Sequence, residues 1–365
     1  MYTNRWIRRA QGRIKTTVLA NLPAGLVGHL REVRHKSGNA TYARRLDSQI
    51  EQYRSVENIH ELPAIFHYWS NRYLRPRMNQ IFGSDSIPEF YARPFLAASS
   101  HCSERPHFLS VGAGDCSVEI GVARKLIELG LGDFELVCLE VSPHLIKRAN
   151  AALESAGLSR RVSVRRVDVN SWQPDENYSA VMANHSLHHL VELESIFEGV
   201  RKSLRPGGVF VINDMIGRNG HMRWPEALEV IELLWDVLPR RLKFNHQASR
   251  WDDEFVNLDC SLDGFEGVRA QEILPLLVRV FSFQKFMAHG GFIDVFCDRA
   301  YGHNFDPARR ADVALIDLIH RFNEALIDNG QIKPTMMFAV LGDERSGSPT
   351  CWQHWSPEYC IRHVE

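Results

Sequence analysis

The chain has 365 residues, with 43 Lys and Arg against 44 Asp and Glu, which gives a formal net charge of −1. This length exceeds the usual size of one hydrophobic core, so we expect one enlarged domain or a domain with an appended cap. A balanced charge gives no general attraction to polyanions, and nucleic acid is therefore not an expected partner.

The pattern of cysteines and the length of the apolar segments indicate the cellular compartment of the protein. The seven cysteines form no CxxC pair and are scattered, at positions 102, 116, 138, 260, 297, 351 and 360, as is typical of reduced thiols. No apolar stretch approaches the roughly 18 residues of a membrane-spanning helix, and the N-terminus has no signal-peptide pattern. We therefore predict a cytoplasmic protein without a transmembrane segment.

Residues 1–40 form a basic leader. Up to Lys36 they contain eight Lys and Arg residues against the lone acid Glu32, interspersed with apolar residues such as Trp6 and Leu19. The segment is either a loosely ordered leader or an anchor for an anionic membrane surface or a partner protein. The sequence defines no oligomeric state.

Residues 41–100 show helical patterns, and we expect a helical cap there, with Pro63 near one helix start and Gly83 at its end. Strands and helices then alternate. Strands are predicted at 107–111, 134–140, 161–168, 178–184, 209–214, 281–289 and 335–342, and helices at 117–130, 142–157, 191–204, 270–280 and about 308–328. An insertion at about 215–269, with a helix at 225–238, interrupts the alternation. The pattern predicts a parallel sheet covered on both faces.

In such sheets ligands bind beyond the carboxyl ends of the strands. The residues at those ends are Gly112-Ala113-Gly114, Glu140, Asp168, Asn184-His185 and Asp214. A GxG turn alone is also found in dinucleotide-binding enzymes. Here Ser117 occupies the place of the third glycine of that fingerprint, and Asp168 has no part in it.

At these residues the chain resembles the class I S-adenosylmethionine-dependent methyltransferases. The resemblance covers about 107–216, more weakly 270–341, and rests on "FLSVGAGD", "LVCLEVSPHLIKRA", "VRRVDVNSW", "YSAVMANHSLHHL" and "SLRPGGVFVIND". It implies an α/β, Rossmann-like sheet of seven strands in the order 3-2-1-4-5-7-6, with the seventh antiparallel. We expect a methyltransferase domain over 101–342 and a C-terminal surface tail over 343–365.

The resemblance also implies S-adenosyl-L-methionine as cofactor. Gly112, Ala113 and Gly114 would border its methionyl and ribose parts, and Asn184 and His185 its sulfonium. Glu140, followed by Val141, would accept hydrogen bonds from both ribose hydroxyls, a task that suits a two-oxygen acceptor. Asp168 and the backbone of Val169 would bind the adenine amine.

The segment "NHSLHH" raises the question of a catalytic base. A hydroxyl acceptor stays protonated at neutral pH, and a histidine oriented by a carboxylate is a suitable base. Combined with an acid that closes the fifth strand, this motif resembles sugar and small-molecule O-methyltransferases. We therefore predict His188 or His189 as general base and Asp214 as its orienting residue or co-base.

Two other interpretations of these histidines stay open. The pair could simply pack the start of a helix. A metal site could combine His185, His188 or His189 with Asp214, but Mg²⁺ prefers a set of oxygen ligands that the sequence does not offer. We expect no metal.

Two flanking segments combine aromatic rings with guanidinium groups, a composition typical of sites for hydroxylated ligands. From them we predict acceptor contacts for Trp69, Arg72, His221, Arg223 and Trp224. The aromatic residues near 69 could equally belong to the core. The acceptor would be a polar small molecule or a glycan.

Three alternative functions remain. The chain could be a catalytically silent S-adenosylmethionine-binding scaffold, a C- or N-methyltransferase of a small molecule or, as a third choice, a dehydrogenase. A nucleic-acid amino-methyltransferase would carry an Asx-Pro-Pro-aromatic run after the fourth strand, where "NHSLHH" stands instead.

Overall fold

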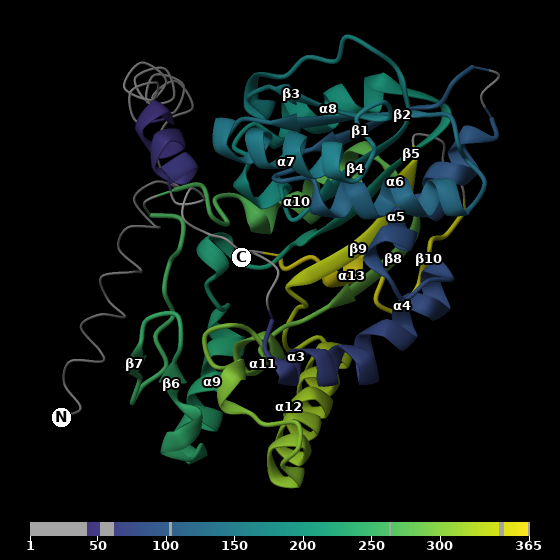
Figure 1. Cartoon of the computed structure of the whole chain (residues 1–365). Coiled ribbons are helices and arrows are strands. Elements are labelled where there is room, and N and C mark those ends of the chain that lie inside the picture. Colours follow the sequence, from purple (N-terminus) through teal and green to yellow (C-terminus); the bar gives the residue numbers. More distant parts are fainter. Residues whose placement is uncertain (1–41, 52–61, 102–103, 263, 343–346, 364–365) are drawn as a thin grey trace, which may run out of the picture. The chain divides into compact units, whose positions relative to one another are not determined.

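The computed structural model describes residues 42–51, 62–101, 104–262, 264–342 and 347–363 (Figure 1). The predicted basic leader lies outside the described residues. The chain divides into two compact units, Met1–Gln49 and Ile50–Glu365. In the first unit residues 42–49 are described and are helical. Everything that follows concerns the second unit.

The core of this unit is a mostly parallel sheet in the order β10-β8-β9-β5-β4-β1-β2-β3 (Figure 1). Strand β9 runs antiparallel to both of its neighbours, β5 and β8. The strands are β1 (His107–Val111), β2 (Glu135–Glu140), β3 (Val162–Arg166), β4 (Tyr178–Asn184), β5 (Leu204–Met215), β8 (Ser282–His289), β9 (Met336–Gly342) and β10 (Thr350–Cys351).

The prediction of a seven-stranded sheet in the order 3-2-1-4-5-7-6 is wrong, because this sheet has eight strands. The eighth, β10, pairs in parallel with β8 at the edge of the sheet. In addition, β6 (Phe244–Asn245) and β7 (Arg250–Trp251) form a separate hairpin in the insertion after β5. Each of these three strands has only two residues, too few to show the alternating pattern that identifies strands in a sequence.

The segment predicted as a C-terminal tail contributes to the core. After β10, the Trp355 side chain is 0% exposed, and its Nε1 donates a hydrogen bond of 2.7 Å to Oδ1 of Asp328. The short helix α13 (Pro357–Cys360) follows and packs against α10 (Ala270–Val280).

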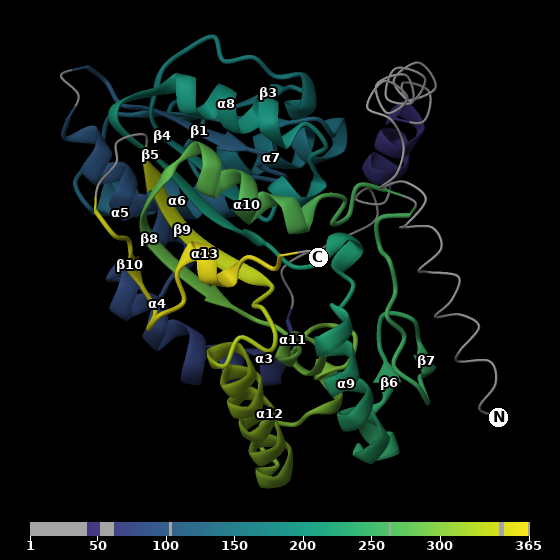
Figure 2. The ribbon, with the colours of Figure 1, turned by 180° about the vertical axis from the view of Figure 1, so that it is seen from behind.

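Helices cover both faces of the sheet, as Figures 1 and 2 show. On one face lie α5 (Ile87–Ser99), α6 (Ser117–Glu128) and α7 (Pro143–Ser155), with α5 packed against α6, β4 and β5. On the other lie α8 (Leu193–Ser203), α10 and α13. The rings of Phe95 and Phe108, with centroids 4.7 Å apart, join α5 to β1 in the buried layer. Burial of such rings supplies the main driving force for this packing.

The helical run at 64–82 begins after Pro63 and ends at Gly83, as the sequence predicted. Gly83 has a φ of 74°, a left-handed conformation that glycine adopts without steric cost. The run consists of α3 (Ala64–Trp69), the π-helical turn η1 (Ser70–Leu74) and α4 (Arg75–Phe82). It packs against α12 (Arg310–Asp328) and β8 rather than forming a separate layer.

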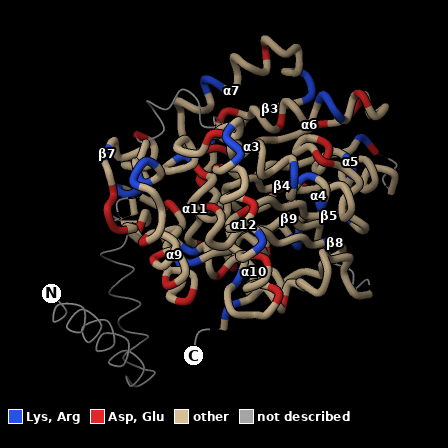
Figure 3. Tube along the Cα trace, turned by 90° about the horizontal axis from the view of Figure 1, so that it is seen from below, with Lys and Arg blue, Asp and Glu red and all other residues tan. Residues whose placement is uncertain are grey.

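The insertion after β5 contains η4 (Asn219–His221), α9 (Pro225–Val237), η5 (Arg240–Leu242) and the β6–β7 hairpin. After β8 come α11 (Ile293–Cys297) and η6 (Gly302–Asn304). Acidic and basic residues are interspersed over the described part of the chain (Figure 3). Among the described residues no helix is long and apolar enough to cross a membrane.

We predict that Trp355→Ala lowers the free energy of unfolding by about 3 to 5 kcal/mol, because it leaves a large cavity and removes the partner of Asp328. Urea unfolding followed by circular dichroism measures the change. Trp251→Ala, at a side chain that is 46% exposed, is the matched control and should cost less than about 1 kcal/mol. Equal losses in both variants would contradict a packed C-terminal segment.

Candidate active site

The polar residues of the site meet at one edge of the sheet. Asn184 at the end of β4 pairs with Asn213 of β5, and Met336 at the start of β9 pairs with both Met215 and His289. The carboxyl ends of β4, β5 and β8 therefore share this edge, where ligands bind in open α/β sheets.

Asp214 is the most enclosed group of the site, with 0% of its side chain exposed. Its Oδ2 accepts hydrogen bonds from the backbone N–H groups of Ser186 (2.9 Å) and Leu187 (2.8 Å), and its Oδ1 accepts one from Met215 (2.8 Å). Burial favours the neutral acid, but the positive charge of His188 and these hydrogen bonds outweigh it and lower the pKa of Asp214 to about 2.

His188 lies between two carboxylates. Its Nδ1 donates to Oδ1 of Asp214 at 2.6 Å, and its Nε2 lies 3.5 Å from Oε1 of Glu266. Burial disfavours the charged imidazole, yet the two carboxylates overcome this effect and raise the pKa of His188 to about 10. The two carboxylates therefore favour the protonated imidazole at neutral pH.

Glu266 connects three histidines and was not found by the sequence reasoning. Its Oε1 lies 2.6 Å from Nε2 of His221, and its Oε2 lies 3.6 Å from Nδ1 of His189. These neighbours lower the pKa of Glu266 although its burial acts in the opposite direction. The residue stands alone in an irregular segment, without the spacing that marks a motif.

Tight backbone contacts bring His221 to Glu266. The N–H of Gly220 donates to the carbonyl of Gly267 at 2.8 Å, and a Cβ on Gly267 would lie 3.0 Å from the Gly220 nitrogen. His221 itself has a φ of 56°, a left-handed conformation that is strained for a residue with a side chain.

His185 is also left-handed, with a φ of 49°, and its N–H donates to the carbonyl of Asn213 at 2.8 Å. The residue is exposed, yet the surrounding protein lowers its pKa to about 4 by desolvation. Burial likewise lowers the pKa of His189, to about 3.

Asn184 is held by two neighbours. Its Oδ1 accepts hydrogen bonds from the Tyr91 hydroxyl (3.1 Å) and from Nδ2 of Asn213 (3.0 Å). Tyr91 comes from α5, far away in the sequence, and was not predicted. With Oδ1 engaged in this way, the Asn184 amide can offer N–H donors to a ligand.

The two glycines of the first turn have different roles. A Cβ on Gly112 would lie 2.7 Å from Cβ of Ser186, so this glycine allows the segment after β4 to approach β1. Gly114 has a φ of 59°, and a Cβ there would meet nothing within 4 Å. Gly114 therefore borders open space beside Ala113, where a ligand can approach the backbone.

Glu140 partly fits its predicted role. Its Oε1 accepts from the backbone of Val141 (2.9 Å) and Ser142 (2.8 Å), and its Oε2 accepts from Gly114 (2.9 Å). Burial raises the pKa of Glu140, and these three hydrogen bonds oppose that shift. One lone pair of Oε2 remains for a hydroxyl group. Accepting two hydroxyls requires that one backbone hydrogen bond be given up.

Asp168 caps the short helix η2 (Val169–Ser171), because its Oδ1 accepts from the N–H of Asn170 at 3.0 Å. This is the helix-cap role that such an acid often has. Its second carboxylate oxygen gives it further acceptor capacity at the same edge.

Of the five predicted acceptor residues, the structure brings His221 to the predicted base His188, with their ring centroids 5.3 Å apart. Trp69 is buried, and its Nε1 donates to Nδ1 of His320 in α12 at 3.2 Å. Arg72 donates to the Tyr73 hydroxyl at 3.0 Å. Trp69 and Arg72 thus support the packing of α3 and η1 on α12.

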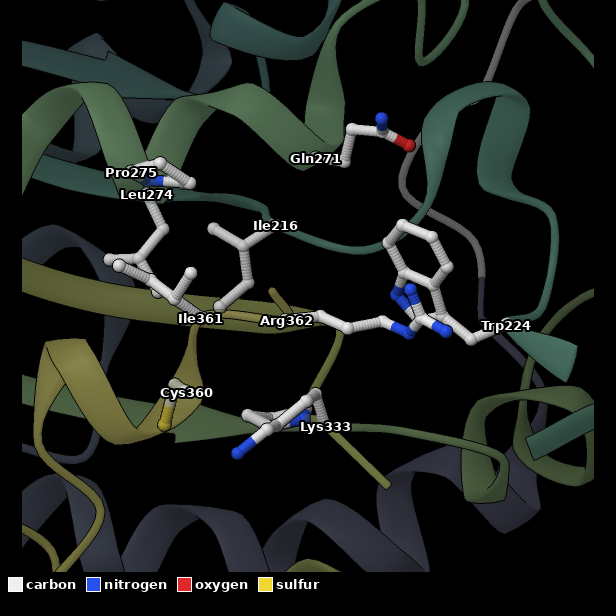
Figure 4. Close-up of a pocket in the computed structure, with 10 residues that line it drawn as sticks. Ile216, Trp224, Gln271, Leu274, Pro275, Lys333, Cys360, Ile361 and Arg362 are labelled. Carbon is white, nitrogen blue, oxygen red and sulfur yellow. The ribbon is translucent and has the colours of Figure 1, made fainter. Parts of the chain in front are cut away.

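The other two predicted acceptor residues, Arg223 and Trp224, make contacts away from His188. Arg223 donates to the carbonyl of Gly291 at 3.0 Å, and the Trp224 ring lies 4.4 Å from the Arg362 guanidinium carbon. Figure 4 shows Trp224 and Arg362 side by side in a small pocket with Ile216 and Gln271. None of His188, His189, His221 and Glu266 lines this pocket, so the pocket is not assigned as the acceptor site.

The geometry agrees with comparisons to known proteins. Residues 109–210 match the family model described as a methyltransferase domain. The prediction of a methyltransferase domain is confirmed for these residues, which are part of the chain. The prediction of S-adenosyl-L-methionine as the cofactor of this domain is confirmed as well.

Two curated relatives are sterol methyltransferases. The chain is 30% identical over 123 residues to the sterol 24-C-methyltransferase of Aspergillus fumigatus, covering 33% of this chain and 31% of that protein. It is 23% identical over 184 residues to the sterol 4-C-methyltransferase of Caenorhabditis elegans, covering 46% of this chain and 52% of that protein. The matches thus span about half of these relatives' length or less.

Among solved structures, the O-methyltransferase of a trans-AT polyketide synthase multienzyme of Brevibacillus brevis, in complex with S-adenosyl-L-homocysteine, is similar with a TM-score of 0.41. It is 12% identical and covers 83% of this chain and 84% of its own.

The raised pKa of His188 predicts a stability effect that depends on pH. Its pKa is about 10 in the folded chain and 6.5 when unperturbed, so its protonated form stabilises the fold below pH 6.5. This stabilisation is lost as the pH rises through the folded pKa. The difference in unfolding free energy between the wild type and His188→Gln should therefore shrink between pH 6.5 and 10.

His185→Gln is the matched control, because the pKa of His185 is lowered instead, to about 4. The wild type should lose stability relative to this variant as the pH falls from 6.5 towards 4. Denaturant titrations at several pH values test both directions. A difference for His188→Gln that does not vary with pH would contradict the ion pairs described here.

Proposed function

We propose that the chain is an S-adenosylmethionine-dependent methyltransferase that methylates a hydroxyl group of a polar small molecule or glycan. His188 accepts the hydroxyl proton, and Asp214 holds the ring. The observation that carries this proposal is the 2.6 Å hydrogen bond from Nδ1 of His188 to Asp214. Of the two predicted bases, His188 has this carboxylate partner, which favours it over His189.

The cofactor residues fit S-adenosylmethionine, which supplies a methyl group on a positively charged sulfonium. The open side of Gly114 admits a ligand, the remaining lone pair of Glu140 Oε2 accepts one ribose hydroxyl, and Asp168 would bind the adenine amine through its carboxylate. The amide of Asn184 and the ring of His185 would border the sulfonium.

The protonated state of His188 must change before it can act as a base. A positive charge bound near Asn184 and His185 disfavours a second positive charge on His188 and so lowers its pKa. His188 then loses its proton from Nε2, the nitrogen that faces Glu266 and His221. Asp214 keeps the Nδ1 proton in place and fixes the ring orientation.

In the transfer step a bond forms between the acceptor oxygen and the methyl carbon, and the bond from that carbon to sulfur breaks. The hydroxyl proton passes to Nε2 of His188 as this oxygen becomes bonded to carbon. The resulting imidazolium is stabilised by Asp214 and Glu266, the two carboxylates that raise its pKa in the free chain. His221, hydrogen-bonded to Glu266, offers the next position for the proton.

C-methylation is the second candidate, because the two curated relatives are named as sterol C-methyltransferases. The cluster suits this reaction too, since Asp214 and Glu266 give it a surplus of negative charge that would stabilise positive charge on a carbon acceptor. Assays with labelled S-adenosylmethionine on a panel of hydroxylated compounds and sterols distinguish the two reactions. N-methylation and a silent scaffold are further alternatives, and turnover of no acceptor would favour the scaffold.

The setting of the reaction is also a proposal. We place the protein in the cytoplasm, with peripheral contact to an anionic membrane through the basic leader as an option for lipid-like acceptors. Binding of the full chain to anionic vesicles, compared with a chain lacking residues 1–40, tests this contact.

We predict that Glu140→Gln weakens S-adenosylhomocysteine binding about 10-fold or more, because a charged acceptor contributes about 1.5 to 3 kcal/mol to a hydrogen bond. Isothermal titration calorimetry measures the affinity. Glu135→Gln, at the start of the same strand, is the control and should bind normally. An unchanged affinity for Glu140→Gln would remove this residue from the cofactor site.

We predict that His188→Gln and Asp214→Asn each lower kcat at least 100-fold while the S-adenosylhomocysteine affinity changes less than about threefold, since the base acts only as the hydroxyl loses its proton. The wild-type kcat/KM should rise with pH above neutrality, because His188 must be neutral and its pKa is raised. His246→Gln serves as the control for histidine removal. Wild-type turnover in both variants would show that positioning alone accounts for catalysis.

A further inference from the structure

Besides their acid-base geometry, His188, His221 and Glu266 bring three potential metal-ligand atoms close together. One potential ligand atom from each of His188, His221 and Glu266 lies within 4.8 Å of the other two. The individual separations from Glu266 are 3.5 Å to His188 and 2.6 Å to His221. Ligand atoms of one tetrahedral ion, at about 2.0 to 2.1 Å from it, lie roughly 3.4 Å apart. Small side-chain adjustments would therefore bring these three atoms to one ion.

The donor types point to a particular class of ion. Two imidazole nitrogens and one carboxylate oxygen suit Zn²⁺ and the other late divalent transition metals. Mg²⁺ and Ca²⁺ prefer sets composed of oxygen ligands. Three protein ligands also leave a coordination position open for water or another ligand.

The surrounding residues support the ligands in the way that metal sites require. Asp214 accepts the Nδ1 proton of His188, which leaves Nε2 as the nitrogen with a free lone pair once the ring is neutral. Three backbone N–H groups fix Asp214 in turn. His221 has a left-handed φ, and the hydrogen bond between Gly220 and Gly267 holds the backbone next to it.

The charges of the cluster are complementary to a dication. Asp214 and Glu266 are both buried or partly buried, and together they carry two negative charges when ionised. With neutral imidazoles, one divalent cation balances them. Without the cation, a proton on His188 offsets part of this charge, because uncompensated charge is costly in a buried site.

We propose that His188, His221 and Glu266 bind one divalent transition-metal ion of the Zn²⁺ class, with Asp214 as the outer partner of His188. The binding goes beyond the proposed function and does not depend on it. Its consequence rests on the proposed function: His188 Nε2 cannot hold a metal and accept a proton at once, so occupancy blocks this proton route.

The test uses the full chain, freed of metal with a chelator and then dialysed. Isothermal titration with ZnCl₂ and visible absorption with CoCl₂ should give one ion per chain. His221→Ala and Glu266→Gln should each weaken Zn²⁺ binding at least 10-fold, and Asp214→Asn by 10- to 100-fold. Circular dichroism verifies that each variant is folded.

Two controls separate the cluster from other ligands. The exposed Cys260 lies beside it, since its N–H donates to the carbonyl of Gly220, so Cys260→Ser tests for a thiol ligand. His246→Ala tests for surface histidines. Both variants should bind Zn²⁺ like the wild type. Failure of the wild type to bind one ion, unchanged binding in both His221→Ala and Glu266→Gln, or loss of binding in Cys260→Ser would overturn the proposed site.

The outcome can be read separately from the proposed function. Binding is measured without cofactor or acceptor, so absent turnover with intact binding would count against the methyltransferase proposal alone. Turnover by the metal-free chain without stoichiometric binding would refute the metal site alone. Where both hold, Zn²⁺ should inhibit the wild type at the concentration at which the titration saturates.

Discussion

The buried carboxylate of Asp214 is the interaction on which the rest of the site depends. It closes β5, accepts three backbone N–H groups and holds the ring of His188 at 2.6 Å. Because removing one partner of a buried ion pair leaves an uncompensated charge, the turn after β4 and the orientation of His188 are coupled to this one side chain. The same contacts that build the loop thus determine where the imidazole points.

Much of this arrangement could be predicted from the sequence, because it lies on long strands with strong patterns. The strand ends at Glu140, Asn184 and Asp214 were placed correctly at one edge, since parallel strands bring their carboxyl ends together. The glycine turn was also recognised, but the packing contact that requires a glycine there was not. Gly112 is needed for the approach of Ser186, a contact between segments far apart in sequence that no local pattern specifies.

The remainder depends on tertiary packing. Glu266 reaches the histidines through contacts between two irregular segments, so neither its position nor its effect on the pKa of His188 has a sequence signal. The aromatic and basic residues near Trp69 were assigned to a substrate site on composition alone, and the structure uses them to pack α3 and η1 on α12. Strands of two residues, such as β10, are too short to show a periodic pattern in the sequence.

The central claim is that His188 holds a proton between two carboxylates and gives it up when a positive charge binds beside it. ¹⁵N NMR of a histidine-labelled chain at pH 8 tests this most directly, comparing no ligand, S-adenosylhomocysteine with its neutral sulfide, and S-adenosylmethionine with its charged sulfonium. The account predicts an imidazolium at His188 in the free chain, and a larger shift towards the neutral ring with S-adenosylmethionine than with S-adenosylhomocysteine. A neutral His188 in the free chain, or equal spectra with the two ligands, would contradict it.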